Sequence, residues 1–429
     1  MPGERGKRLC FGSLTNLKWW LALALPLSCT SALAQQPFFV ELPESVRLDQ
    51  AIRYAIEHNP TLAAARREVN ATEGQVLQGS LRPNPEFNYQ ADDVSRFGRT
   101  STAEVGVPFE TGGKREARVR SAGLGREVAL ADLGTAELRL RSAVIAAFFD
   151  VLAAQELRAT AEESVRLAQR ATDIAAKRVA AGKISPVEET RARVAEAGAR
   201  VTLNQSESEL RNSRRRLASL WGNTVPSFTE ASGDVEQLPL VPTADLIVGR
   251  LEAAPQLRRA QRELERRKAL VTLEQARSVP DFTVSLGVKR NLELPGEQAL
   301  VALKVPLPIF NRNQGNLQEA LRREDKAAEE LQATQTALSA TALQALENVN
   351  ARRRDADLLR QEVLPGARST YEAATIGFEN GKFSFLEVLD AQRTLIAAKS
   401  QYLIALANFH RAQAELESLI GDLTPENER

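Results

Sequence analysis

The 429-residue sequence is long enough for two or three domains, and its 43% hydrophobic and 26% charged residues are the balance of a folded protein. With 56 basic and 55 acidic residues the net charge is +1, so the charge gives no indication of nucleic acid or another strongly anionic partner. Aromatic residues make up only 5%, so the interior must consist mainly of Ala, Leu and Val, which suit close packing of helices.

The first 34 residues have the pattern of a secretory signal peptide. Basic residues precede an apolar stretch at 19–27, and small residues mark a cleavage site after Ala34. Both cysteines lie before that site, so the exported chain is expected to rely on packing and assembly rather than disulfides. An alternative makes Cys29 a lipidation site, but Pro26 stands where Leu is usual, which favours cleavage.

Residues 35–222 are expected to form a first structural repeat. A short helix is predicted over 48–57, and Asn59-Pro60 then supplies an N-cap and a proline suited to the first turn of a second helix. Alternating apolar and polar residues predict a β-hairpin over 85–109. A helix predicted over 113–181 contains no proline and would extend roughly 100 Å.

Two predicted helical turns share residues at the same spacing. The segments 182–186 and 381–385 both begin Gly-Lys and carry Ser at the fourth position, with an offset of 199 residues. Glycine permits positive φ where a helix stops, and Pro186 suits the first turn of the returning helix. Pro60 and Pro255 repeat at a similar offset, 195. These matched signals indicate an internal duplication.

The second repeat is expected over 244–421. It contains a predicted β-hairpin at 280–309 and a long helix at 314–379, in which Pro365-Gly366 predicts a kink. The returning helix at 385–420 has apolar residues at the spacing of a coiled-coil seam. These seam residues are Leu395, Tyr402, Leu406, Phe409, Leu416 and Ile420. Lys399 and Gln413 interrupt the seam.

Two segments lie outside the repeats. Residues 223–243 are rich in Pro, Gly, Ser and Asp, which predicts an irregular connector with a short strand. Residues 422–429 form a polar tail.

The four predicted strands have the length expected of strands that cross a membrane. No segment after the signal peptide is apolar for long enough to cross a membrane as a helix, but strands of about nine to eleven residues suit a tilted membrane strand. Soluble surface hairpins are the alternative for any single hairpin. Four strands cannot close a barrel, and lipid does not tolerate open sheet edges. Membrane-spanning strands would therefore require several chains to pool them.

Residues that carry chemistry are scarce. The exported chain has two histidines, His58 and His410, and neither cysteine nor methionine, so it offers no ordinary transition-metal site. It has no Gly-rich phosphate loop, Ser/His/Asp pattern or nucleotide motif, and its paired carboxylates are typical of solvated helix faces. We therefore predict no catalytic residue, no cofactor, no bound metal and no enzymatic activity.

The duplicated order of these elements resembles the TolC-like outer-membrane factors, the exit ducts of tripartite export systems in Gram-negative bacteria. The residues that carry the resemblance are Asn59-Pro60 with Leu62, Val107-Pro108-Phe109, Val305-Pro306-Leu307-Pro308 and the turn at 381–391. The segments 110–115 (Glu-Thr-Gly-Gly-Lys-Arg) and 308–316 (Pro-Ile-Phe-Asn-Arg-Asn-Gln-Gly-Asn) are similar to the heavy-metal branch, which serves cobalt–zinc–cadmium pumps.

The resemblance implies a mainly α fold with a membrane β-barrel portion. Three chains would each give four strands to one twelve-stranded barrel in outer-membrane lipid, standing on a periplasmic α-helical barrel. The periplasmic tips, where an adaptor protein docks, would include Gly182, Lys183, Gly381 and Lys382. Two acidic residues after the second turn would ring the narrowest part of the tube, at Glu387 and Asp390. Relatives have aspartate at both positions, so Glu387 keeps the charge but has a longer side chain. The alternative interpretation is that Glu387 and Asp390 are ordinary exposed carboxylates on a helix.

The implied function is a passive duct from periplasm to exterior. Energy and most substrate selection would belong to an inner-membrane pump of the RND type and its periplasmic adaptor, and divalent heavy-metal cations would be the cargo. An export duct for drugs or proteins is the alternative within transport. A periplasmic coiled-coil scaffold without a pore is the alternative from another class.

Overall fold

The computed structural model describes residues 44–92, 100–291, 296–380 and 382–421. The predicted signal peptide, the polar tail and Gly381 lie outside these ranges. Among the described residues, no helix has both the length and the apolarity needed to cross a membrane.

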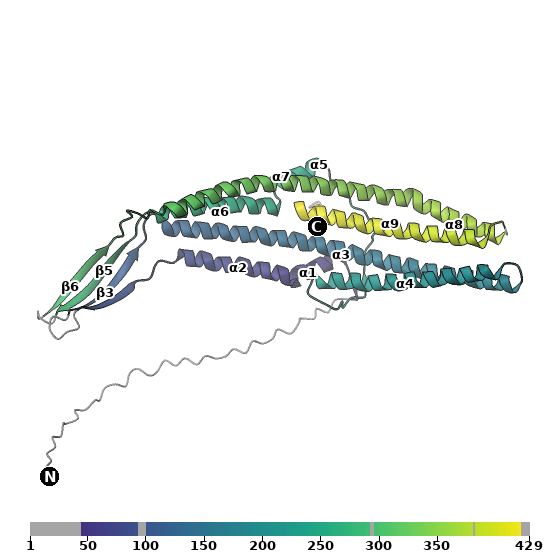
Figure 1. Cartoon of the computed structure of the whole chain (residues 1–429), viewed down its shortest axis with the longest axis horizontal. Coiled ribbons are helices and arrows are strands. Elements are labelled where there is room, and N and C mark those ends of the chain that lie inside the picture. Colours follow the sequence, from purple (N-terminus) through teal and green to yellow (C-terminus); the bar gives the residue numbers. More distant parts are fainter. Residues whose placement is uncertain (1–43, 93–99, 292–295, 381, 422–429) are drawn as a thin grey trace, which may run out of the picture. The chain divides into compact units, whose positions relative to one another are not determined.

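Apart from the two-residue strand β1 (Ser45–Val46), the first half of the chain forms two short helices, two longer strands and two long helices (Figure 1). These are α1 (Leu48–His58), α2 (Pro60–Ser80), β2 (Glu86–Asp92), β3 (Thr100–Phe109), α3 (Lys114–Ala180) and α4 (Pro186–Ser219). The 67 residues of α3 correspond to roughly 100 Å of continuous helix.

The second half repeats this order, as the sequence offsets predict. Its elements are α5 (Ala244–Leu251), α6 (Pro255–Arg277), β5 (Phe282–Asn291), β6 (Glu297–Lys304), α7 (Gln314–Leu358), the π-helical turn η1 (Leu359–Val363), α8 (Leu364–Glu379) and α9 (Phe385–Ile420). The interruption expected at Pro365 is present as η1, immediately before the proline. Pro365 has no N–H for the carbonyl four residues earlier, and a π turn accommodates that lost bond.

The four long strands form one antiparallel sheet in the order β2-β3-β5-β6. Phe87 lies opposite Val105, Val105 opposite Leu286, and Leu286 opposite Val301, so one row of apolar residues crosses all four strands. These side chains are 46–74% exposed. The apolar face of the sheet is therefore uncovered in a single chain.

β6 ends earlier than predicted. It ends at Lys304, inside the hairpin predicted to reach residue 309. Pro306 and Pro308 follow within four residues and cannot donate a ladder hydrogen bond, which explains why pairing stops there.

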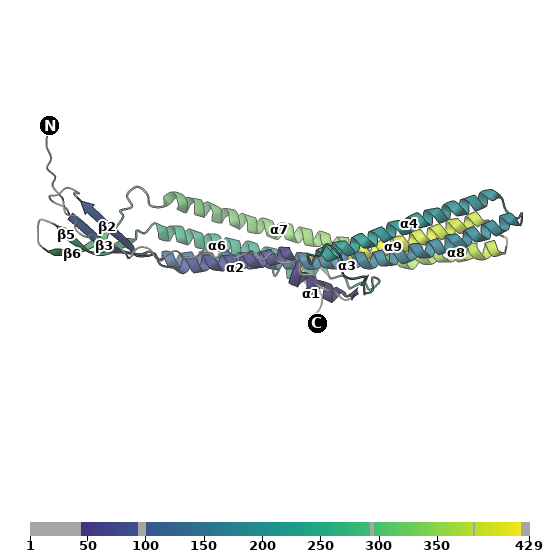
Figure 2. The same cartoon turned by 90° about the horizontal axis from the view of Figure 1, so that it is seen from below.

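The helices next to the sheet lie in the same order as the strands. α2 packs on α3, α3 on α6, and α6 on α7, so α2 and α7 are the outer members of the row (Figure 2). Toward the other end of α3, its partners are α4 and α9, and α8 packs on α9.

The core follows the seam predicted on α9. All six seam residues are buried, and Phe409, Leu416 and Ile420 belong to a cluster with residues of α5, α6 and α7. The first interruption, Lys399, forms an ion pair with Glu163 of α3 at 2.7 Å, so it joins the two repeats. Gln413 is buried, and its amide donates to Glu417.

The connector 223–243 contains the expected short strand. β4 (Glu230–Ala231) pairs in parallel with β1 (Ser45–Val46), which leads into α1. Nearby, the Asn59 side chain caps α2 by accepting from the Leu62 N–H, and its amide donates to the Leu220 carbonyl at 2.8 Å. One asparagine thus joins the start of α2 to the end of α4.

Candidate functional site at the hairpin tips and the sheet junction

The first tip is a tight turn that begins at a left-handed glycine. Gly182 has φ of 67°, its N–H donates to Val179, and the Lys183 N–H donates to Arg178 at 2.9 Å. Ser185 caps the returning helix α4 through the Val187 N–H. The positive φ at Gly182 is the conformation that the sequence predicts.

The second tip is built on another glycine. The N–H groups of Lys382 and Phe383 both donate to the Gly377 carbonyl, at 2.7 and 3.2 Å. The Phe383 ring also covers the α-carbon of Gly377, which leaves no room for a Cβ atom there. Lys382 is exposed.

The two predicted gate carboxylates have different local roles. Glu387 forms a capping box with Ser384: its carboxylate accepts from the Ser384 N–H at 2.6 Å, and the Ser384 hydroxyl accepts from the Glu387 N–H. Asp390 is one helical turn further on, exposed, and lines a groove between α4 and α9. Neither carboxylate forms an ion pair with another residue of the described ranges.

The first tip has an ion pair at the positions equivalent to Glu387 and Asp390. At the offset of 199, Glu188 corresponds to Glu387, and Arg191 corresponds to Asp390. Glu188 and Arg191 form an ion pair at 3.1 Å, so the first tip is locally neutral at these positions. The acid at 390 in place of a base therefore puts two carboxylates one turn apart on the second hairpin, and Arg191 and Arg393 line the same groove as Asp390.

The two tips touch each other through α3 and α8. The Arg178 guanidinium lies over the Phe378 ring, 4.0 Å from its centre. Ala175, Ala192 and Leu389 form a small buried cluster beside this contact. Within one chain, the helical hairpin α3/α4 is thus held against the helical hairpin α8/α9, close to the predicted gate.

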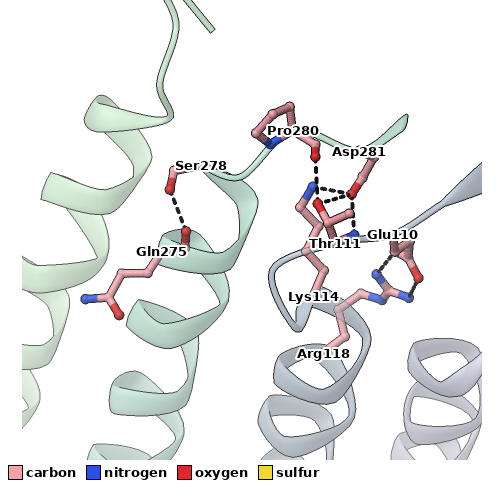
Figure 3. Close-up of polar contacts among 8 residues, drawn as sticks. All are labelled: Glu110, Thr111, Lys114, Arg118, Gln275, Ser278, Pro280 and Asp281. Atoms are coloured by element: carbon pink, nitrogen blue, oxygen red, sulfur yellow. Dashed lines mark hydrogen bonds and ion pairs between the residues drawn. The ribbon is translucent and has the colours of Figure 1, made fainter. Parts of the chain in front are cut away.

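A second polar cluster joins the sheet to the helices (Figure 3). The Lys114 ammonium and the Thr111 N–H both contact the same carboxylate oxygen of Asp281, at 2.7 and 2.8 Å, and the Thr111 hydroxyl donates to the Pro280 carbonyl. Burial alone would raise the pKa of Asp281, but the hydrogen bonds from Lys114 and Thr111 lower it. The start of α3 is therefore tied to the start of β5.

A bidentate ion pair between Arg118 and Glu110 continues this cluster. The Arg118 hydrogen bond holds the pKa of Glu110 below its ordinary value. Between these residues Gly112 has φ of 66°, and a side chain there would meet Val279 of the neighbouring segment.

The equivalent turn of the second repeat centres on Asn313. Its φ is 61°, and its side-chain amide donates to the carbonyl and the carboxylate of Glu274, at 2.8 and 2.7 Å. The segments 110–115 and 308–316 are therefore turns that lead from a strand into a long helix. Sequence reasoning missed Asp281 as a partner, because it lies 167 residues from Lys114.

The described residues contain no group of three or more His, Cys, Asp or Glu side chains that could hold a metal ion. His58 lies at the end of α1 beside the Tyr54 carbonyl. His410 is buried in α9, stacked on Phe149, with its Nε2 at 2.9 Å from the Val235 carbonyl. Burial lowers the pKa of His410 to about 4, so it is neutral at ordinary pH.

The fold is that of known outer-membrane channels. The outer membrane channel CmeC of Campylobacter jejuni superposes with a TM-score of 0.75, covering 87% of this chain and 85% of that chain at 16% identity. The predicted class, mainly helical with four strands per chain in a duplicated order, is confirmed.

Sequence comparison gives the family. Residues 51–223 and 246–422 match the outer membrane efflux protein family, so the chain belongs to it, and the prediction of a non-enzymatic efflux protein is confirmed. The cobalt-zinc-cadmium resistance protein CzcC of Cupriavidus metallidurans is 44% identical over 87% of this chain and 90% of its own length. The pyoverdine export outer membrane protein OpmQ of Pseudomonas aeruginosa is 26% identical over 77% of this chain and 72% of its own.

Proposed function

We propose that three copies of this chain form one duct, in which their sheets close into a twelve-stranded barrel in the outer membrane. The observation that supports this is the sheet itself. Its apolar face is uncovered and its outer strands, β2 and β6, each present a free edge within the described part of the chain. Lipid would cover the face, and neighbouring copies would pair with the edges.

The proposed cargo is a divalent heavy-metal cation, carried from the periplasm to the exterior. The 44% identity to CzcC over most of both chains supports this. The more distant relationship to OpmQ supports an organic cargo as the alternative. No resident metal site is needed for either, because a passive duct need not bind what it conducts.

The proposed partners are a periplasmic adaptor and an inner-membrane RND-type pump, which would supply the energy. Gly182, Lys183, Gly381 and Lys382 would lie at the docking tips. Lys183 and Lys382 are both exposed, which supports that role. The chain would reach the periplasm through a signal peptide cleaved after Ala34.

The proposed gate consists of Glu387 and Asp390 from three copies. Threefold symmetry would gather six carboxylates around a narrow axis, where they would concentrate cations and repel anions. The exposure of both residues and the absence of an ion pair on either one, within the described ranges, support this role.

Deletion of the gene tests the cargo. We expect the deletion strain to lose growth on cobalt, zinc or cadmium, and the wild-type gene to restore it. A strain that becomes sensitive only to organic toxins would contradict the metal cargo and favour the alternative. A strain unaffected by both would contradict export by this chain under the conditions tested.

A further inference from the structure

A hollow lies between α4 and α9, in the half of the molecule that carries the hairpin tips. Both helices pack on α3, which contributes Ser164 and Ala168 to the lining. The volume of the hollow is about 510 Å³, within the range of small-molecule sites. Its lining residues span positions 194–202 of α4 and 389–397 of α9, so the hollow extends for ~12 Å along each helix.

The hollow exists because the α4 face beside it carries small side chains. Ala195, Gly198 and Ala199 line it, and a Cβ atom added at Gly198 would meet nothing within 4 Å. Larger apolar side chains form the rest of the apolar wall: Val194, Leu389 and Ile396. Small and apolar residues alone would also suit a packed helix, so the polar residues of the wall decide which ligand the hollow fits.

Gln392 of α9 is the polar residue that indicates a ligand. Its side chain is only 7% exposed, lines the hollow, and makes no hydrogen bond with any residue of the described ranges. Most buried polar side chains of folded proteins are hydrogen-bonded, because a buried amide without a partner is unfavourable. A ligand oxygen that accepts from this amide inside the hollow would supply the missing partner.

The charge of the lining is positive. Among the described residues that line the hollow, Arg393 is the one charged side chain, and it forms no ion pair within the described ranges. It follows Gln392 directly, so both polar groups come from the same turn of α9. A guanidinium binds a carboxylate through two parallel hydrogen bonds, and an amide N–H can donate another. The pair therefore suits an anion and not a metal cation.

The charges next to the hollow set the orientation of such an anion. Toward the tip, Arg393 also borders the adjoining groove that contains Asp390. Arg191 lines that groove as well, but it pairs with Glu188. A carboxylate should therefore bind on the side of Arg393 that faces away from Asp390, with its apolar body against the small residues of α4.

We infer that this hollow is a binding site for an amphipathic organic anion. Arg393 and Gln392 hold its carboxylate, and the small-residue face of α4 covers its apolar body. One chain supplies every residue of this lining, so the inference does not depend on the proposed trimer or on the proposed metal cargo.

Calorimetric titration of the detergent-solubilised protein with naproxen, an aromatic carboxylate, tests the site. We expect saturable binding, and about tenfold weaker binding of the neutral naproxen amide, which cannot form the charged pair. Arg393→Gln should remove this preference for the acid, and Gln392→Leu should weaken the binding of both compounds. Arg193→Gln, which removes a charge of α4 outside the lining, is the control and should retain the affinity of the wild type. Equal affinity of the wild type for the acid and the amide would contradict the site.

Filling the hollow gives an independent test. Ala199→Leu adds volume inside the lining and leaves both polar side chains in place, so it should abolish binding. Ala197→Leu adds the same volume to an exposed position outside the lining and should bind like the wild type. Equal binding by the two variants would indicate uptake by detergent or by other apolar surface and would contradict the inference. A wild type that binds no naproxen, because a second copy or another protein fills the hollow, would contradict it as well.

Discussion

The Phe383 ring at the second tip lies on the backbone of Gly377, where an added Cβ atom would stand 2.6 Å from Cε2 of the ring. Gly377 also accepts two backbone hydrogen bonds from the turn. Any side chain at 377 must therefore displace the ring and loosen the turn.

We expect Gly377→Ala to reduce export while trimer assembly is retained, because the change alters only the proposed docking tip. Gly366→Ala in the same helix is the control, since a Cβ atom there meets nothing within 4 Å. Metal tolerance of cells and trimer content of their membranes are the measurements. Equal tolerance with both variants would contradict a docking role for this tip.

Arg178→Ala should weaken the contact between the two hairpins. A cation–π interaction at a partly exposed site contributes about 0.5–1 kcal/mol, so the loss should raise the resting conductance of the channel only modestly. Lys177→Ala, the adjacent residue, is the control. Unchanged conductance in planar bilayers would show that the Arg178–Phe378 contact does not hold the tip closed.

The gate prediction needs substitutions that preserve the helix cap. Glu387→Gln keeps an acceptor for the Ser384 N–H, and Asp390→Asn is similar in size, so the double variant removes charge with little change of shape. We expect lower cation selectivity and weaker block by divalent ions. Glu188→Gln on the first tip is the control. If the double variant keeps the selectivity and block of the wild type, these residues do not line the pore.

The sequence predicted the fold and the tip turn at Gly182 because their signals are local. Prolines at helix starts, period-2 strands and two Gly-Lys turns at one offset each report on a few neighbouring residues. The Lys114–Asp281 and Arg178–Phe378 contacts join residues 167 and 200 positions apart. No local pattern encodes such a pair. β6 ends at Lys304, inside the hairpin predicted to reach residue 309, because Pro306 and Pro308 cannot donate ladder hydrogen bonds.

His410 makes folding stability depend on pH. Its pKa is about 4 in the folded chain against an ordinary value of 6.5, so between these values the unfolded chain binds more protons. The contribution of neutral His410 to the free energy of unfolding is therefore present above pH 6.5. It falls by about 3 kcal/mol as the pH drops toward 4. His410→Gln should flatten this dependence in denaturation curves measured from pH 7 to 4. An equally steep curve for the variant would assign the dependence to other groups.

The mass of the purified protein tests the central claim, which is that four strands per chain close only with those of two further copies. We expect the mature protein, extracted from outer membranes in mild detergent, to have the mass of three chains by native mass spectrometry. Circular dichroism would measure its strand content before and after dissociation. A stable monomer that retains the full strand content would contradict the account.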